Sequence, residues 1–318
     1  MLTEKQIVDK YNNGEKLVIS VIGDSVTSGI EANSGPILWT NGVAYAATNQ
    51  PNAYPNLDPN SPYYINDTTY PSQAQQDNLA IPTAVRQFRT LIEAKNATSV
   101  VTNWGIPGWD AAGHLSSGTV ALVAAQNPKP DVVIINLGIN SAKNRVSMLA
   151  DLRTLVDQVL AEDIFVLLAQ PNNIGVVGSP AGSWDQTSLP DTWFPLDYWP
   201  TTVAEIKTVS SERNTGFVNT GTADLQLEIE KLYDPFHPNE VGFADIASRY
   251  LNWFAFGSSE MGNGAMIKTI NGKSYYQSRN GNEAFKARMK SGQIVSMPLT
   301  RTIDQLRIRA GSGKVTFE

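Results

Sequence analysis

The chain has 318 residues, of which 42% are hydrophobic and 17% are charged, and its formal net charge is −6. This length and composition predict a folded protein with a substantial core, built as one large domain or as a main domain with a small appendage. Lysine and arginine are scattered without a basic stripe, so we expect no nucleic-acid partner.

The N-terminal segment is charged and polar, which is unlike a signal peptide and predicts a short amphipathic helix. No apolar run reaches the roughly 18 residues of a membrane span, so we expect no membrane partner. The chain has no cysteine and only two histidines, His114 and His237. Disulfides, thiolate nucleophiles and cysteine-bound metals are therefore excluded, and we predict neither a dedicated zinc site nor a cofactor.

Four continuous apolar runs predict buried parallel strands, and a weaker run predicts a fifth. Continuous runs indicate strands that are covered on both faces, whereas one-sided strands alternate. Helical patterns lie between and after these runs, and this alternation predicts right-handed crossovers and a three-layer α/β/α sandwich. The predicted strands are 17–22, 99–104, 131–138, 163–170 and 215–220. The predicted helices are about 82–97, 116–126, 146–161, 200–213 and 240–254.

Two long segments, 31–80 and 171–200, lack periodicity. The first is rich in Asn, Pro, Tyr and Thr, and the second holds five prolines and three tryptophans. Loops of this length inside a compact domain are usually functional or mobile. Both segments follow the carboxyl ends of predicted strands, which is the edge where open α/β sheets bind ligands.

The pattern changes after about residue 256. Short alternating runs predict a small β module with about five strands, and Asn271-Gly272 and Asn280-Gly281 are predicted hairpin turns. We therefore expect a main domain at 1–256 and a β module at 257–318. The role of the module stays open between glycan binding, packing against the main domain and homo-oligomerisation, which unpaired strand edges favour.

The first predicted strand ends in Gly23-Asp24-Ser25. These residue types form turns, so a structural turn serine is the simple alternative. A serine hydroxyl becomes a good nucleophile only beside a base, and His237 is the better imidazole because Asp234 precedes it by three residues. At that spacing one tight turn would let Asp234 orient His237, as in a Ser-His-Asp triad. Pro238 is predicted to open the last helix.

Ester chemistry also requires hydrogen-bond donors where negative charge develops. Segment 103–113 contains glycines whose N–H groups can approach a substrate closely. Segment 136–142 places Asn140 at the tip of a strongly apolar strand. An amide side chain is costly there unless it has a role or a partner, and capping of the following segment is the alternative.

Four short blocks together resemble the SGNH (GDSL-like) hydrolase family, over about residues 15–256. In the family's order they are Gly23-Asp24-Ser25, Gly105 within Asn-Trp-Gly-Ile-Pro-Gly, Gly138-Ile139-Asn140 and Asp234-Pro-Phe-His237. The resemblance implies a flavodoxin-like sandwich with a five-stranded parallel sheet. It implies Ser25 as nucleophile, His237 as base and Asp234 as its orienting acid. It also implies an oxyanion hole formed by the Ser25 N–H, the Gly105 N–H and the Asn140 side chain.

One position departs from the family: Ser141 stands where an Asp is frequent, outside the catalytic residues. The chain lacks Gly-x-Ser-x-Gly, which argues against the other common serine-hydrolase arrangement. We expect Asp24 to brace the loop or to lie near the substrate, and His114 to be a surface or helix-capping residue. Aromatic side chains near the predicted site suit either sugar rings or ordinary packing. They are Trp104 and Trp109 beside the donor loop, and Trp184, Trp193, Tyr198 and Trp199 in the second long segment.

These features lead to the hypothesis of a serine esterase that removes acetyl or other short acyl groups from a carbohydrate. The partner would be an acetylated glycan or a small ester. Two alternatives stay open: a lipase or thioesterase of the same family, and a non-catalytic glycan-binding or structural tail protein on a hydrolase scaffold. The polar, cysteine-free sequence is similar to tail-associated deacetylases of bacteriophages, which implies a virion-associated or extracellular location.

Overall fold

The computed structural model describes residues 1–29, 82–172, 198–220 and 237–258, together with strand segments at 38–40, 43–45, 265–270, 273–278, 285–288 and 294–297. The chain divides into two compact units, Met1–Leu251 and Asn252–Glu318. The domain boundary expected at residue 256 stays a prediction. In the described ranges, every helix is too short or too polar to cross a membrane.

A five-stranded parallel sheet forms the centre of the first unit. Its strands are β1 (Val18–Gly23), β4 (Val100–Gly105), β5 (Val132–Asn136), β6 (Phe165–Gln170) and β7 (Gly216–Asn219). They lie in the order β4-β1-β5-β6-β7, which is the flavodoxin-like arrangement. All five predicted strands are present, and the predicted fold class is confirmed.

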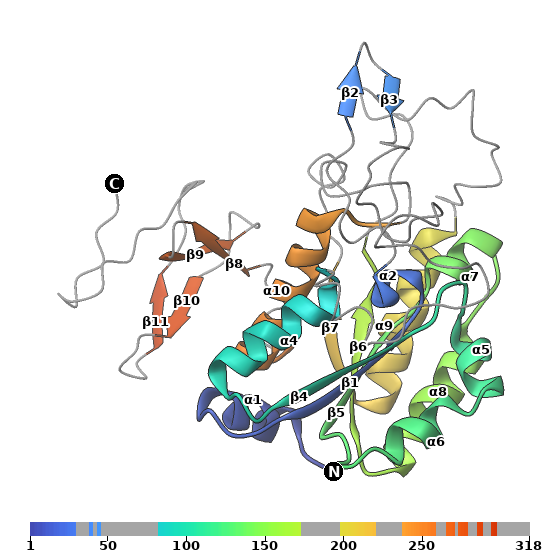
Figure 1. Cartoon of the computed structure of the whole chain (residues 1–318), viewed down its shortest axis with the longest axis horizontal. Coiled ribbons are helices and arrows are strands. Elements are labelled where there is room, and N and C mark those ends of the chain that lie inside the picture. The colour runs from blue at the N-terminus through green and yellow to red at the C-terminus, as the bar shows by residue number, and fades with distance from the viewer. Residues whose placement is uncertain are drawn as a thin grey trace, which may run out of the picture. The chain divides into compact units, whose positions relative to one another are not determined.

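Helices cover both faces of this sheet and give the three predicted layers (Figure 1). On one face α4 (Ala84–Lys95) lies beside α10 (Glu240–Phe256), and the rings of Phe88 and Tyr250 meet edge to face at 5.6 Å. Helices on the other face share a core with alternate strand residues, among them Val133 and Ile135 of β5. These helices are α5 (Ala111–Ser116), α6 (Thr119–Ala124), α8 (Leu149–Ala161) and α9 (Trp199–Arg213), while α1 (Glu4–Asn12) precedes β1.

The carboxyl ends of β1, β4 and β5 lie level with one another. Gly23 ends β1 and is paired with Gly105 at the end of β4 and with Asn136 at the end of β5. The segments that follow these strands therefore start side by side at one edge of the sheet. This is the edge at which α/β proteins bind ligands.

Some helices differ from their predicted bounds. The helix expected at 116–126 is instead two short helices, α5 and α6, because Gly118 adopts a left-handed conformation between them (φ 67°). Two further helices, α2 (Ser25–Ser28) and α7 (Ile139–Asn144), have no counterpart among the predicted elements. Both follow the carboxyl ends of strands, α2 after β1 and α7 after β5.

The start of α10 corrects the prediction made for Pro238. The helix begins at Glu240, and Asn239 caps it, because its side-chain Oδ1 accepts a hydrogen bond from the Gly242 N–H at 3.1 Å. Asparagine is among the best N-cap residues, so the residue after the proline determines where the helix starts.

Short antiparallel pairs lie outside the central sheet. β2 (Leu38–Thr40) pairs with β3 (Val43–Tyr45) inside the segment expected to lack regular structure. In the second unit, β8 (Ala265–Ile270) pairs with β9 (Lys273–Ser278), and β10 (Phe285–Arg288) pairs with β11 (Ile294–Met297). Ile270 lies opposite Lys273, as a two-residue hairpin turn requires. The predicted turns Asn271-Gly272 and Asn280-Gly281 themselves lie outside the described residues.

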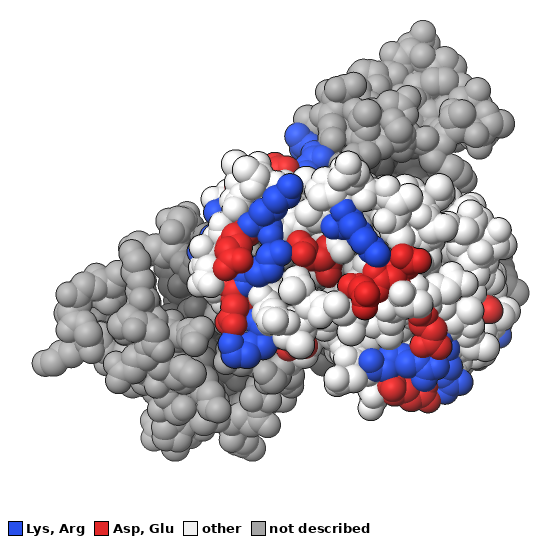
Figure 2. All heavy atoms as spheres, turned by 90° about the horizontal axis from the view of Figure 1, so that it is seen from below, with Lys and Arg blue, Asp and Glu red and all other residues white. Residues whose placement is uncertain are grey.

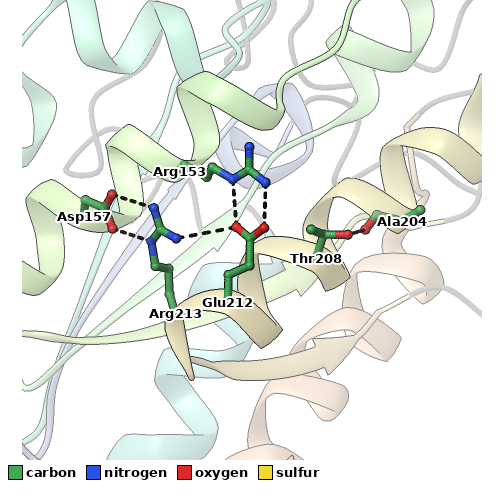
Figure 3. A network of polar contacts seen from close by, with 6 residues as sticks. All are labelled: Arg153, Asp157, Ala204, Thr208, Glu212 and Arg213. Carbon is green, nitrogen blue, oxygen red and sulfur yellow. Dashed lines mark hydrogen bonds and ion pairs between the residues drawn. The ribbon is translucent and has the colours of Figure 1, made fainter.

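Basic and acidic side chains are interspersed on the face shown in Figure 2. One cluster joins α8 to α9 (Figure 3). Arg153 of α8 makes two hydrogen bonds to Glu212 of α9 (2.7 and 2.6 Å), and Arg213 makes two to Asp157 (2.7 and 2.9 Å). Solvent screens such surface pairs, so they add little to stability, but each charge faces an opposite one.

Candidate active site

Ser25 is the first residue of α2, directly after β1. Asp24 caps this short helix, because its Oδ1 accepts a hydrogen bond from the Val26 N–H at 3.0 Å. The helix ends at Gly29 in a left-handed conformation (φ 88°). The first N–H groups of a helix have no acceptor within it, and the Ser25 N–H makes no hydrogen bond within the described part of the chain. The hydroxyl and the N–H of Ser25 are therefore both at the sheet edge.

His237 reaches this serine from the segment that precedes α10. Its Nε2 lies 2.8 Å from the Ser25 Oγ, although the two residues are 212 positions apart in sequence. A neutral imidazole with an unprotonated Nε2 accepts a hydrogen bond from the hydroxyl and can remove its proton. Asp234, the expected orienting acid, lies outside the described residues, so its contact with His237 stays a prediction.

Two glycines allow α2 to pack closely on the sheet. A Cβ at Gly105 would lie 2.3 Å from the Ser28 backbone N, and one at Gly23 would lie 2.7 Å from the Asn136 carbonyl oxygen. Both distances are too short for any side chain. The Asn103 side chain strengthens the same contact, because its Nδ2 donates to the Thr27 carbonyl at 2.9 Å. Strand β4 is thereby held against the helix that carries Ser25.

Two of the three expected oxyanion donors have acceptors within the protein. The Gly105 N–H donates to the Asn103 Oδ1 at 2.9 Å. The Asn140 side chain, which is half-buried, donates through Nδ2 to the Trp109 carbonyl at 2.9 Å. An amide NH₂ has two hydrogens, so Asn140 keeps one for a ligand. Gly105 would have to give up its bond to Asn103.

A further donor lies three residues beyond Gly105. Gly108 follows Pro107 in a turn that the Trp109 N–H closes on the Ile106 carbonyl (3.2 Å), and its φ is 79°. A Cβ on Gly108 would meet nothing within 4 Å, and its N–H makes no hydrogen bond within the described part of the chain. A donor role for this glycine was not predicted from the sequence. The Pro-Gly pair is the signal, since a type II turn takes Pro and then Gly at its two central positions.

Asp24 is 1% exposed, so its carboxylate lies inside the protein next to the nucleophile. Burial raises the pKa of the Asp24 carboxyl to about 6. The Val26 N–H, the charge of His237 and the Ile139 N–H lower that pKa in part. The Oδ2 atom has no hydrogen-bond partner within the described part of the chain.

His114 is fully buried, which corrects its predicted surface or capping role. Its Nε2 lies 3.0 Å from the Gly23 carbonyl and its Nδ1 lies 3.1 Å from the Thr119 Oγ1. A carbonyl only accepts, so Nε2 carries the proton and donates to Gly23. Burial lowers the pKa of His114. The residue is a neutral internal brace behind the end of β1.

The described tryptophans near the site are half-buried. Trp104 on β4 packs against the core, and its indole N–H is buried without an acceptor in the described part of the chain. Trp109 packs edge to face on His114 at 5.1 Å. Tyr198 and Trp199 lie at the start of α9, whereas Trp184 and Trp193 fall outside the described residues. Contact of these side chains, or of Asp24, with a substrate stays a prediction.

Metal ligands do not gather in the described ranges. No group of three or more His, Asp or Glu side chains lies close enough together there to hold an ion.

Structural comparison finds likenesses at low sequence identity. A variant of Axe2, an acetyl xylan esterase from Geobacillus stearothermophilus, is 19% identical, with a TM-score of 0.48 over 76% of this chain and 95% of that chain. LAE5, an α/β hydrolase enzyme from the metagenome of Lake Arreo, is 13% identical, with a TM-score of 0.48 over 76% and 96%. A member of the lipolytic protein G-D-S-L family from Veillonella parvula is 14% identical, with a TM-score of 0.44 over 75% and 98%.

Sequence comparison gives the family. None of the curated proteins compared with the chain matches it significantly. The model of the GDSL-like Lipase/Acylhydrolase family matches residues 65–244. This match covers more than half of the chain; it includes His237 and begins after Ser25. The chain belongs to the GDSL-like lipase/acylhydrolase family.

Proposed function

We propose that the protein is a serine esterase that removes acetyl or other short acyl groups from a carbohydrate through an acyl-enzyme intermediate. The observation that carries this proposal is the 2.8 Å contact between the Ser25 Oγ and the His237 Nε2. Membership of an acylhydrolase family supports the reaction type. No resident cofactor or metal takes part in the proposed chemistry.

In the first half-reaction the Ser25 Oγ attacks the ester carbonyl carbon while the His237 Nε2 takes the hydroxyl proton. The carbonyl oxygen becomes negatively charged in the tetrahedral intermediate and needs preorganised donors. The Ser25 N–H and the second Asn140 amide hydrogen are two donors. The third comes from the loop after β4, either Gly105, after its bond to Asn103 opens, or Gly108. His237 then gives its proton to the departing sugar oxygen, which breaks the ester bond.

In the second half-reaction water attacks the acyl carbon of the acyl-enzyme. His237 takes a proton from this water and returns it to the Ser25 Oγ as the acid leaves. Asp234 would hold the imidazole in the tautomer that leaves Nε2 free to accept.

The carbohydrate part of the proposal rests on side chains beside the donor loop. Trp104 and Trp109 flank the predicted donors, and flat aromatic faces suit the C–H faces of sugar rings. The long segments 31–80 and 171–200 are polar and aromatic, whereas an acyl trough for a long chain would be rich in Leu and Met. Association with a phage tail, and a virion-associated or extracellular location, stay predictions from the sequence.

Steady-state hydrolysis of p-nitrophenyl acetate and p-nitrophenyl octanoate tests the proposal. We expect the acetyl ester to be preferred, and we expect Ser25→Ala and His237→Ala each to lower kcat by at least about 10³-fold. Ser210→Ala is the matched control, since this buried serine bonds to the Thr215 carbonyl and lies in α9. Retention of activity by Ser25→Ala would disprove the mechanism, and preference for octanoate would favour a lipase.

Release of acetate from a panel of acetylated polysaccharides tests the substrate class. Acetate released by the wild type and not by Ser25→Ala would support a carbohydrate deacetylase. Turnover of small esters alone, with no polysaccharide deacetylated, would limit the proposal to a short-chain esterase.

A further inference from the structure

Asp24 carries a negative charge that its role as a helix cap does not require. Its Oδ1 caps α2 by accepting from the Val26 N–H at 3.0 Å. Asparagine and serine cap helices as well as aspartate does, so the cap does not require a negative charge. The carboxylate is 1% exposed, and a buried charge destabilises a protein unless an opposite charge or a set of donors answers it.

The charge of Asp24 interacts electrostatically with the base of the proposed reaction. The only charged side chain among the described residues that acts on it electrostatically is His237. Tyr250 of α10 also interacts electrostatically with Asp24, but burial raises the pKa of this phenol, so it stays neutral. No arginine or lysine of the described ranges pairs with Asp24. A positive charge on His237 is therefore the one that the carboxylate can stabilise.

This charge appears during the reaction. His237 becomes an imidazolium when it takes the Ser25 proton, and Ser25 directly follows Asp24 in the chain. We propose that the buried Asp24 carboxylate stabilises the imidazolium of His237, which makes Asp24 a positioning residue of the reaction in addition to the predicted Asp234. This inference rests on the proposed esterase function.

The pH dependence has a definite sign. Burial raises the pKa of Asp24 to about 6, so the carboxyl is mainly ionised above that pH and protonated below it. An ionised neighbour favours the protonated form of an imidazole, by about one pKa unit or more for charges within a few ångströms. Removal of the carboxylate should therefore lower the pKa of His237 and move the acid limb of the pH–rate profile to lower pH.

The test compares Asp24→Asn and Asp24→Ser with the wild type on p-nitrophenyl acetate from pH 4.5 to 9. Both variants keep an oxygen that can cap α2. We expect kcat to fall by about 10- to 100-fold with KM within about twofold, and the acid limb of kcat/KM to move down by about one pH unit. Glu205→Gln is the matched control, because Glu205 is also a buried carboxylate but bonds to Ser147 and Met148 at the start of α8.

Thermal unfolding at pH 4 and pH 8 separates a loss of catalysis from a loss of stability, whereas the acid limb of kcat/KM is the readout that a merely structural role would not move. Ionised Asp24 destabilises the folded wild type at pH 8. The Tm of Asp24→Asn minus the Tm of the wild type should therefore be about 5 °C larger at pH 8 than at pH 4. A loss of kcat that follows a loss of Tm at every pH, or an unchanged kcat and acid limb in either variant, would overturn the inference. Ester hydrolysis that persists in the Ser25→Ala variant would instead overturn the proposed function.

Discussion

His114 shows how a buried titratable group can serve the nucleophile without touching it. Its Nε2–H donates to the carbonyl of Gly23, two residues before Ser25. Its Nδ1 accepts from Thr119, whose hydroxyl also contacts Ser117 at 2.8 Å. This chain of bonds fixes the end of β1, and burial favours the neutral imidazole by lowering the pKa of His114.

Replacement of His114 by Gln tests this role. A glutamine amide can donate to the Gly23 carbonyl, and we expect the free energy of unfolding to fall by about 1–2 kcal/mol at pH 8. Because burial lowers the pKa of His114 below its ordinary value, the unfolded chain binds a proton that the folded chain refuses. Below about pH 6.5 the wild type should therefore lose stability that the variant keeps.

Urea unfolding at pH 8 and pH 5 measures both effects. The stability difference between wild type and His114→Gln should narrow at pH 5. A difference that stays constant over this range would show that His114 is not held neutral.

The role of a single residue was predictable where its chemical type is rare in the sequence and suited to catalysis. The pairing of Ser25 with His237 follows from a hydroxyl at a strand end and one of only two imidazoles. The burial of His114 could not be predicted, because it depends on Gly23, 91 positions away. The occupied Gly105 N–H was equally hidden, since the direction of an N–H depends on backbone angles that a glycine leaves open.

At the scale of elements, the site depends on the contact between α2 and β4. We expect Gly105→Ala to displace α2, because the new Cβ would lie 2.3 Å from the Ser28 N and 2.6 Å from the Thr27 carbonyl carbon, both backbone atoms. The Ser25 Oγ would then move relative to the His237 Nε2, and a misplacement of about 1 Å can lower the rate about 100-fold.

Esterase kinetics and thermal unfolding of Gly105→Ala check this prediction. Asn103→Ala, which removes the side-chain bonds to Thr27 and Gly105 without a clash, serves as the comparison. We expect it to lower activity less than Gly105→Ala does. Wild-type kcat in Gly105→Ala would contradict the close contact between α2 and β4.

The strands were more predictable than the short helices. Each strand is a continuous apolar run, and burial on both faces makes that pattern visible in the sequence. The helices α2 and α7 span four and six residues, too few for a helical period to be recognised. The start of α2 depends on the Asp24 cap, and α7 follows Gly138, where a Cβ would lie only 2.9 Å from the Thr202 Cγ2 of α9.

At the scale of the whole molecule, the strand order explains why the distant blocks converge. Since β1 lies between β4 and β5, the segments after these three strands meet at one edge. Asn140 of α7 contacts the segment after β4, and His237, which precedes α10, contacts Ser25 after β1. Alternation of strands and helices predicted the three layers, and the flavodoxin-like arrangement of the sheet was implied by the family resemblance. Secondary structure inside the long segments was not predictable, as the β2–β3 pair inside 31–80 illustrates.

The last prediction concerns the C-terminal module. Its described strands form two separate two-stranded sheets, β8–β9 and β10–β11. Isolated two-stranded sheets are marginally stable, and unpaired edges attract further strands, so we expect the module to assemble with copies of itself. In light scattering the full chain should then have a multiple of its 34.6 kDa mass, and a chain shortened to residues 1–258 should be monomeric. Its kcat on p-nitrophenyl acetate should stay within about twofold of the full chain's, because Ser25, Asn140 and His237 all lie in Met1–Leu251. An unchanged number of subunits on shortening would exclude the module from assembly, and loss of turnover would show that the first unit depends on it.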